Sequence, residues 1–254
     1  MSEVAVVRDA GEVAAAAAEL FVEASAGAVA ARGRGAVALT GGSTAKLLYE
    51  KLRSPPLRDR VPWSALHFFF TDERAVPPQD ERSNYGLAQR ELLAHVPAQP
   101  AQVHPLRGEA PDLDAEARRA AAELRAILGA PPRFDLVLLG LGPDGHICSL
   151  FAGVPSSAAR GDDELVRHVR APEHLEPRVD RLTLTPFLVV TARNVALQVV
   201  GEQKAEVLAR ALKGKEDLVA CPAQWLRHAA GRVVIAADAA AAALLAAASP
   251  PPAR

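Results

Sequence analysis

The sequence predicts an α/β protein built on one mostly parallel sheet with helices on both faces. Three observations support this fold class. Apolar strand-like runs alternate with helical segments along the whole chain, and such alternation produces parallel strands joined by helices. The run at 134–139, FDLVLL, is nearly continuous in apolar residues, which is typical of a strand covered on both faces. With 254 residues, 50% of them hydrophobic, the chain is long enough to bury a large core.

The individual elements follow from apolar runs, alanine content, caps and breakers. The expected strands cover residues 4–7, 36–39, 66–70, 134–139, 165–169, 181–185, 195–200 and 233–236. The expected helices cover 12–31, 45–52, 84–94 capped by Ser83, a segment from Asp112 or Asp114 to Gly129, one with Thr185 as N-cap and Pro186 at N1, 203–212, and a last one opened by Asp238. No repeat or linker divides the chain, so we expect one domain at 1–248 and a Pro-rich tail at 249–254.

Composition narrows the possible partners and location. The chain carries 29 basic and 30 acidic residues, and a net charge of -1 gives no field that would hold a nucleic acid or an anionic membrane. The Ala-rich stretches at 13–18 and 236–248 are shorter than a membrane span requires. Two cysteines and an N-terminus without the pattern of a signal peptide favour a cytoplasmic protein.

Four polar loops follow predicted strands directly. They read TGGST at 40–44, TDER at 71–74, GPDGH at 142–146 and GEQK at 201–204. In open α/β sheets ligands bind beyond the carboxyl ends of the strands, and these ends meet at one edge. The sequence therefore predicts that the four loops converge on a single site.

Two of these loops have the features of an anion site. A glycine turn at Gly42 leads into a helix, which leaves free N–H groups and a helix dipole beside Ser43 and Thr44. Either hydroxyl could instead serve as an ordinary N-cap. Lys204 lies in the first turn of the expected helix 203–212, where the dipole disfavours a cation. A bound anion between Lys204 and the helix start would explain this placement.

The other two loops carry groups suited to acid–base chemistry. Asp72 and Arg74 follow one strand, and Asp144 and His146 follow another. Histidine has an ordinary pKa of about 6.5, so it is a base near neutral pH. Either carboxylate could orient the imidazole, and the plainer alternative is a tight turn with a capping Asp144 and a surface His146. The histidines lack metal-ligand spacing and no GxSxG elbow follows a strand, so we expect neither a metal nor a serine nucleophile.

Taken together, the motifs resemble those of the 6-phosphogluconolactonase family. The matching segments are TGGST at 40–44, TDERAVP at 71–77, RSNY at 82–85, GLGPDGHICSLFAG at 140–153, RLTLT at 181–185 and GEQKAEVL at 201–208. The family is similar to glucosamine-6-phosphate deaminases and ribose-5-phosphate isomerases. The resemblance implies a three-layer α/β/α, Rossmann-like fold without a cofactor. It also implies hydrolysis of 6-phospho-D-glucono-1,5-lactone to 6-phospho-D-gluconate, the second step of the oxidative pentose phosphate pathway.

The resemblance also assigns roles to residues. It implies that His146 of the DGH motif is catalytic and that Asp72 and Arg74 belong to the active-site loop. The sugar phosphate would be held by four residues, which are Ser43, Thr44, Arg181 and Lys204. We interpret Cys148, where the family often has a small residue, as a packing residue and not a nucleophile. We expect the protein to act as a monomer.

Two other functions share features with this prediction. A deaminase or isomerase would have the same fold and phosphate site, but the deaminase has a glutamate after the DGH motif, and ICSLFAG at 147–153 has none. A non-catalytic sugar-phosphate sensor of a transcription regulator would carry a DNA-binding helix-turn-helix ahead of the sensor, and this chain has no room or basic patch for one.

Overall fold

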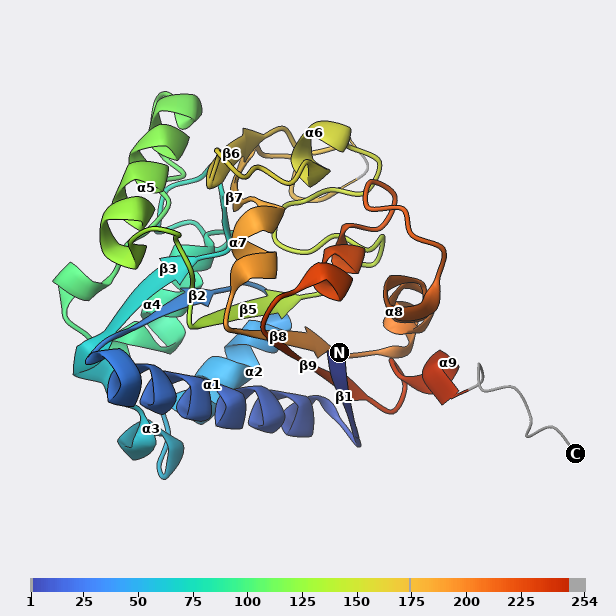
Figure 1. Ribbon diagram of the computed structural model, residues 1–254, viewed down its shortest axis with the longest axis horizontal. Helices are drawn as coiled ribbons and strands as arrows, with labels where there is room; N and C mark the ends of the chain where they lie inside the picture. Colours follow the sequence, from blue (N-terminus) through green and yellow to red (C-terminus); the bar gives the residue numbers. More distant parts are fainter. Residues whose placement is uncertain (1, 174, 247–254) are drawn as a thin grey trace, which may run out of the picture.

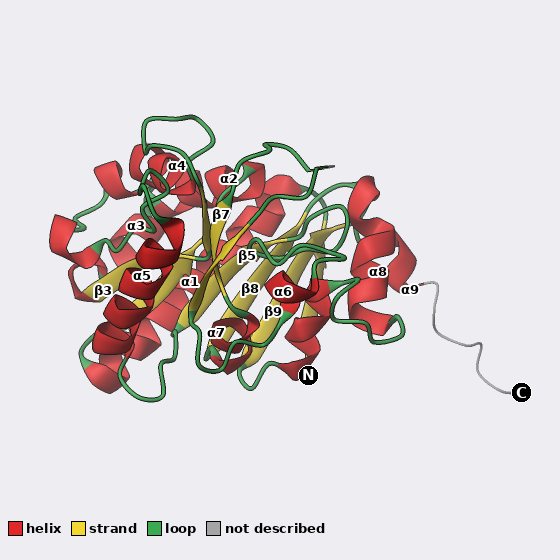
Figure 2. Cartoon of the chain, turned by 90° about the horizontal axis from the view of Figure 1, so that it is seen from above, coloured by secondary structure: helices red, strands yellow, loops and turns green. Residues whose placement is uncertain are grey.

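The centre of the fold is a parallel sheet of six strands. The computed structural model describes residues 2–173 and 175–246 (Figure 1), so the tail predicted at 249–254 lies outside the described residues. The strand order is β1 (Ser2–Val7), β9 (Arg232–Asp238), β8 (Asn194–Val199), β5 (Leu136–Gly140), β2 (Gly35–Leu39) and β3 (Leu66–Phe70). Every neighbouring pair is parallel, and Figure 2 shows β5, β8 and β9 running side by side. The predicted sheet is confirmed.

A second, antiparallel sheet was not predicted. It has the order β4 (Asp72–Arg74), β7 (Arg181–Leu184) and β6 (Val166–Val169). Thr71 joins the two sheets, because its N–H donates to the carbonyl of Leu39 in β2 and its carbonyl accepts from Leu184 in β7, both at 2.8 Å. The segment at 71–74 is therefore partly a strand and not simply a loop.

Helices cover both faces of the large sheet. They are α1 (Ala10–Arg32), α2 (Ser43–Leu52), α3 (Leu57–Arg60), α4 (Asn84–Glu91), α5 (Leu113–Leu128), α6 (Pro155–Ala158), α7 (Pro186–Thr191), α8 (Ala205–Lys213) and α9 (Ala243–Ala246). In Figure 1, α1 and α3 lie on one side of the sheet, whereas α5, α7 and the small sheet lie on the other. The described residues thus form three layers, as predicted.

Helix α1 contains the whole helix expected at 12–31 and is only slightly longer, although the Ala-rich stretch at 13–18 alone is shorter than a membrane span. Its 23 residues begin at an N-cap, where the Asp9 side chain accepts from the N–H of Glu12, and end at Gly33 with φ of 71°. By length and composition alone it is apolar enough to cross a membrane, so length does not exclude a span. Its apolar face, with Phe21 fully buried, instead packs into the core against β9, β8 and α2.

Two helix starts differ from the expected positions. Helix α2 begins at Ser43 and not at residue 45, with Gly42 as N-cap at φ of 90° and no side-chain cap, so of the two alternatives left open for Ser43 and Thr44 the cap is not the one found. Asp238 is the final residue of β9, and the last helix, α9, begins later, at Ala243. The Asp238 carboxylate accepts from the N–H of Ala241, as an N-cap does, and from the N–H of Gly201, so it caps the turn that precedes α9.

A buried tyrosine fastens the glycine loop at 40–44 to the sheet. Tyr49 of α2 is fully buried, and its hydroxyl donates to the carbonyl of Thr40 at 2.6 Å. Burial raises the pKa of Tyr49, so the hydroxyl stays protonated and keeps donating. Losing such a buried bond typically costs about 1–3 kcal/mol. The bond fixes the start of α2 relative to the end of β2.

Candidate active site

A cleft of about 600 Å³ lies at the carboxyl edge of the parallel sheet. Residues from all four predicted loops line it, together with the ends of β5 and β8 and the start of α1. Its lining includes most of the predicted site residues, namely Gly42, Ser43, Thr44, Asp72, Arg74, His146 and Lys204. The convergence predicted from the sequence is therefore present in the structure.

His146 and Asp144 form a hydrogen-bonded pair on the turn after β5. The imidazole Nδ1 lies 2.6 Å from Oδ1 of Asp144, and the same oxygen accepts from the backbone N–H of His146 at 3.2 Å. Burial would raise the pKa of Asp144, but the hydrogen bond and charge of His146 outweigh it and lower the pKa to about 2. An ionised carboxylate only accepts, so Nδ1 carries the hydrogen and Nε2 is left as the basic nitrogen.

Gly142 makes room for this imidazole. A Cβ at position 142 would lie 2.1 Å from Nδ1 of His146, far closer than atoms approach. The N–H of Gly142 also donates to the carbonyl of His146 at 2.8 Å, which closes the turn. Phe151 meets the ring edge-on, with centroids 5.8 Å apart. The ring is therefore held by a carboxylate, a bare glycine and an aromatic side chain.

Asp72 holds loops together and does not contact His146 in the structure. Its carboxylate accepts from Ser149 Oγ at 2.7 Å and from Asn84 Nδ2 at 3.1 Å, and it is 6% exposed. Asn84 lies against Gly41, where a Cβ would be 1.8 Å from its Oδ1. These contacts join the glycine loop at 40–44, β4 and the segment after His146. Of the two carboxylates considered from the sequence, Asp144 is the one that orients the imidazole.

The end of the cleft where the sequence predicts an anion combines a helix start with a lysine. Ser43 and Thr44 occupy the first turn of α2 and line the cleft. Lys204 closes the 3₁₀ turn Glu202–Lys204 immediately before α8, and its Nζ donates to the carbonyl of Leu141 at 2.5 Å. Burial lowers the pKa of Lys204, and the charge of Asp144 opposes this. An ammonium has three donors, so two remain for a ligand.

Arg74 and Arg181, which face each other across β4 and β7, differ in position. Arg74 lines the cleft, with one guanidinium nitrogen donating to the carbonyl of Arg82 at 2.6 Å and a buried Nε that has no partner among the described residues. Arg181, opposite it in the β4–β7 register, does not line the cleft. Its guanidinium donates to the carbonyls of Val179 and Pro177, and burial together with the charge of Arg74 lowers its pKa to about 10. The phosphate role expected for Arg181 stays a prediction without a supporting contact here.

Cys148 lies in the cleft wall with an unusual backbone. It has a φ of 52°, and it is the one residue other than glycine with positive φ among those described. Burial and the charge of Asp72 raise the pKa of its thiol well above the ordinary value, against a hydrogen bond with Thr71. A protonated thiol is a poor nucleophile, in agreement with the packing role inferred from the sequence.

Sequence reasoning missed Gln198. This residue of β8 is 1% exposed and lines the cleft, and neither its Oε1 nor its Nε2 has a partner among the described residues. Buried polar groups are nearly always paired, so an unpaired carboxamide beside a cleft is a candidate ligand contact. The available signal was a glutamine interrupting an otherwise apolar strand, ALQVV at 196–200.

The carboxyl edge of this parallel sheet combines a histidine that has a free ring nitrogen with a lysine beside a helix start. This arrangement is typical of an enzyme that acts on a small phosphorylated substrate. Comparisons with known proteins give the same class in finer detail. A family model described as glucosamine-6-phosphate isomerases/6-phosphogluconolactonase matches residues 8–235. The chain belongs to this family.

Individual relatives agree with the family match. The 6-phosphogluconolactonase of Streptomyces coelicolor is 36% identical over 227 residues, which are 86% of this chain and 85% of that protein. The 6-phosphogluconolactonase of Mycobacterium leprae is 40% identical over 195 residues, 74% of this chain and 76% of its own. The structure of the Trypanosoma brucei 6-phosphogluconolactonase superposes with a TM-score of 0.82 at 31% identity, covering 96% of this chain and 99% of that chain.

Proposed function

We propose that the chain hydrolyses 6-phospho-D-glucono-1,5-lactone to 6-phospho-D-gluconate, in the oxidative pentose phosphate pathway. The observation that carries this is the His146–Asp144 pair, with a free imidazole nitrogen, in the same cleft as Lys204 and the start of α2. A lactone is an activated ester, so its hydrolysis needs a base for water, a donor for the oxyanion and a grip on the distal phosphate. The cleft supplies a group for each.

The reaction divides into two proton transfers at one histidine. Nε2 of His146 takes a proton from water as the oxygen attacks C1 of the lactone, and the carbonyl electrons move onto its oxygen. When the tetrahedral intermediate collapses, the bond from C1 to the ring oxygen breaks. The imidazolium then returns its proton to that oxygen, which leaves as the C5 hydroxyl. Asp144 stays ionised throughout and stabilises the imidazolium.

Arg74 is better placed to stabilise the oxyanion than the backbone of the turn at 140–146. Three N–H groups of this turn are already engaged in hydrogen bonds. Gly142 donates to the carbonyl of His146, Gly145 to that of Gly142, and His146 to Asp144. Arg74 lines the cleft with nitrogen atoms that the protein does not fully use.

The assay that tests the proposal follows acid release from freshly made 6-phosphogluconolactone against its spontaneous hydrolysis. The protein should accelerate the release, and glucosamine 6-phosphate offered in parallel should give no ammonia, because no glutamate follows the DGH motif in 147–153. Acid release at the spontaneous rate by the folded protein would remove the proposal, and ammonia formation would replace it with the deaminase.

Lys204→Ala should mainly weaken binding. Loss of a charged hydrogen bond to phosphate typically costs about 1.5–3 kcal/mol, so affinity for 6-phosphogluconate should fall by about 10- to 150-fold. Calorimetric titration measures it, with Lys51→Ala, an exposed lysine of α2 outside the cleft, as the matched control. Parental affinity in Lys204→Ala would show that the phosphate binds elsewhere.

Arg74→Ala should lower kcat as well as affinity, because the oxyanion forms only during the reaction. Steady-state kinetics separates the two effects, and Arg74→Lys, which keeps the charge but not the planar donor, should recover only part of kcat. An effect on affinity alone would move Arg74 from the reacting end of the substrate to the binding set.

The active unit in this proposal is the monomer. Each group assigned above comes from a single chain, and the cleft they line is formed within it. Light scattering after size exclusion, at the concentration used for the assay, measures the mass directly. Activity that disappears on dilution to monomer would contradict this part of the proposal.

A further inference from the structure

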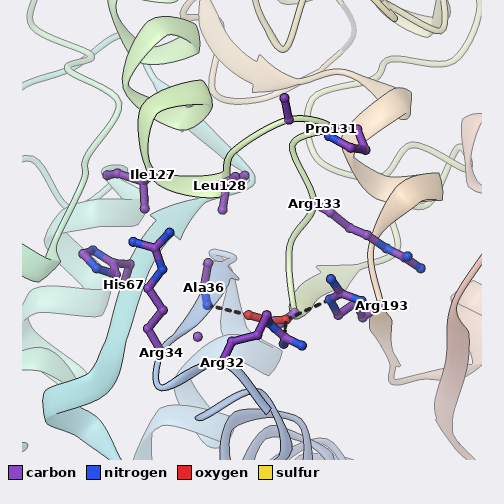
Figure 3. Close-up of a pocket in the computed structure, with 12 residues that line it drawn as sticks. Arg32, Arg34, Ala36, His67, Ile127, Leu128, Pro131, Arg133 and Arg193 are labelled. Atoms are coloured by element: carbon purple, nitrogen blue, oxygen red, sulfur yellow. Dashed lines mark hydrogen bonds and ion pairs between the residues drawn. The ribbon is translucent and has the colours of Figure 1, made fainter.

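A second cleft opens at the opposite edge of the parallel sheet, where β2, β5 and β8 begin (Figure 3). Its volume is about 410 Å³, within the range of small-molecule sites. The end of α1, the start of β2, the end of α5 and the segment before β5 form its walls. None of its lining residues is shared with the catalytic cleft, so the two are separate sites.

Positive charge is concentrated in this cleft. Its lining contains four arginines and a single carboxylate, namely Arg32, Arg34, Arg133, Arg193 and Asp135. Asp135 is buried, and both of its carboxylate oxygens already have partners. Its Oδ1 pairs with Arg32 and, at 3.2 Å, with Arg193, and its Oδ2 accepts from the N–H of Ala36 at 2.9 Å. In a chain of net charge -1, the cleft is therefore a local excess of cations that one carboxylate does not neutralise.

Arg34 is the cation most available to a ligand. It is exposed, and its guanidinium makes no ion pair or hydrogen bond with any residue in the described part of the chain. In Figure 3 it extends towards Ile127 and His67, whereas Arg133 extends away on the other side of the cleft. Burial and, to a smaller extent, the charges of His104 and Arg34 lower the pKa of His67, which lines the same wall.

The rest of the wall is apolar. Ile127 and Leu128 come from the end of α5, and Ala130 and Pro131 follow them. A ligand that fits both parts has an anionic group for the arginines and an apolar or planar body for this surface. Guanidinium groups match phosphate geometry with paired hydrogen bonds. We propose that this cleft binds a phosphorylated small molecule, with its phosphate on Arg34 and its organic body against Leu128 and Pro131.

The probe for this proposal is 1-naphthyl phosphate, which has a phosphate ester and a planar apolar body. Because a phosphate ester also suits the catalytic cleft, the titration uses Lys204→Ala as background and follows backbone amide shifts by NMR. At low ionic strength we expect saturable shifts at Gly35 and Ala36, which line the second cleft. Adding Arg34→Ala should weaken this binding about fivefold or more.

Matched controls separate charge from surface. Arg170→Ala, which removes an exposed arginine outside the cleft, should leave affinity unchanged, and Arg34→Lys should keep part of it. 1-Naphthol, which lacks the phosphate, should bind more weakly than the ester. Arg34→Ala alone should keep the parental kcat for the lactone, because it lies outside the catalytic cleft.

Three outcomes would overturn the proposal. They are the absence of saturable shifts at Gly35 and Ala36, equal affinity of 1-naphthyl phosphate for the Arg34→Ala protein and its background, and equal binding of 1-naphthol and the ester. Each is independent of lactone hydrolysis, so failure here and failure of the proposed function are distinguishable.

Discussion

Replacing His146 with alanine should lower kcat for lactone hydrolysis by about 10²–10⁴-fold, the usual share of general acid–base catalysis. In the proposed reaction the imidazole is the base in the cleft, and the bond of its Nδ1 to Asp144 leaves Nε2 free. Affinity for 6-phosphogluconate should stay near the parental value, because Lys204 and the start of α2 are untouched. Initial rates corrected for spontaneous hydrolysis, together with calorimetric titration of the product, measure the two quantities.

The pH dependence of kcat gives an independent readout. In the parent, kcat should fall towards acid pH, because a general base works only in its unprotonated form, and this limb should vanish in His146→Ala. Asp144 cannot cause the limb, because its pKa is lowered to about 2 and it stays ionised far below neutral pH. A folded His146→Ala protein with parental kcat across the range would exclude the histidine and make Asp72 the next candidate base.

Asp144→Asn should lower kcat by about 10²-fold with little change in product affinity. The substitution keeps the shape of the side chain but removes the charge that fixes the imidazole tautomer and stabilises the imidazolium. Asp144 acts through His146, so it is a positioning residue. Combined with His146→Ala, Asp144→Asn should therefore have almost no further effect on kcat, and this non-additivity is what a double-mutant cycle measures.

Asp72→Asn provides the comparison for Asp144. Asp72 contacts Ser149 and Asn84 and not the imidazole, so its loss should act through the arrangement of the loops. We therefore expect its effect to remain in the His146→Ala background, together with a lower Tm. If Asp144→Asn instead added fully to His146→Ala, the assignment of the orienting carboxylate to Asp144 would be wrong.

The family, the α/β fold and the parallel sheet were predictable from the sequence because their signals are local. The strand at 66–70 matches β3 residue for residue, and Ser83 caps α4 as expected, because its Oγ accepts from the N–H of Gly86. The family match at residues 8–235 confirms what the loop motifs predicted. Convergence of four loops also followed, since it depends only on parallel strands sharing one edge.

What the sequence could not give depends on contacts between distant segments. The strands expected at 165–169 and 181–185 are present as β6 and β7, but they pair with each other and with β4 in a separate sheet, which Thr71 joins to the large one through Leu39 and Leu184. The choice between Asp72 and Asp144 depended on which carboxylate reaches the ring, and Asp72 is taken by Ser149, 77 positions away. Gln198 belongs to no sequence motif. It stands out only in the structure, where its carboxamide is buried without a hydrogen-bond partner among the described residues.

The bare backbone at Gly142 has a consequence for mutational tolerance. Any larger residue there would place a carbon where the imidazole of His146 now lies, so the ring would have to leave Asp144. The chain could still fold, because the displaced group is a single side chain at the cleft surface. A saturation scan scored for activity would therefore find positions 142 and 146 equally intolerant. Substitutions at 142 would displace the imidazole, and substitutions at 146 would remove it. Scored for abundance instead, both positions would tolerate change.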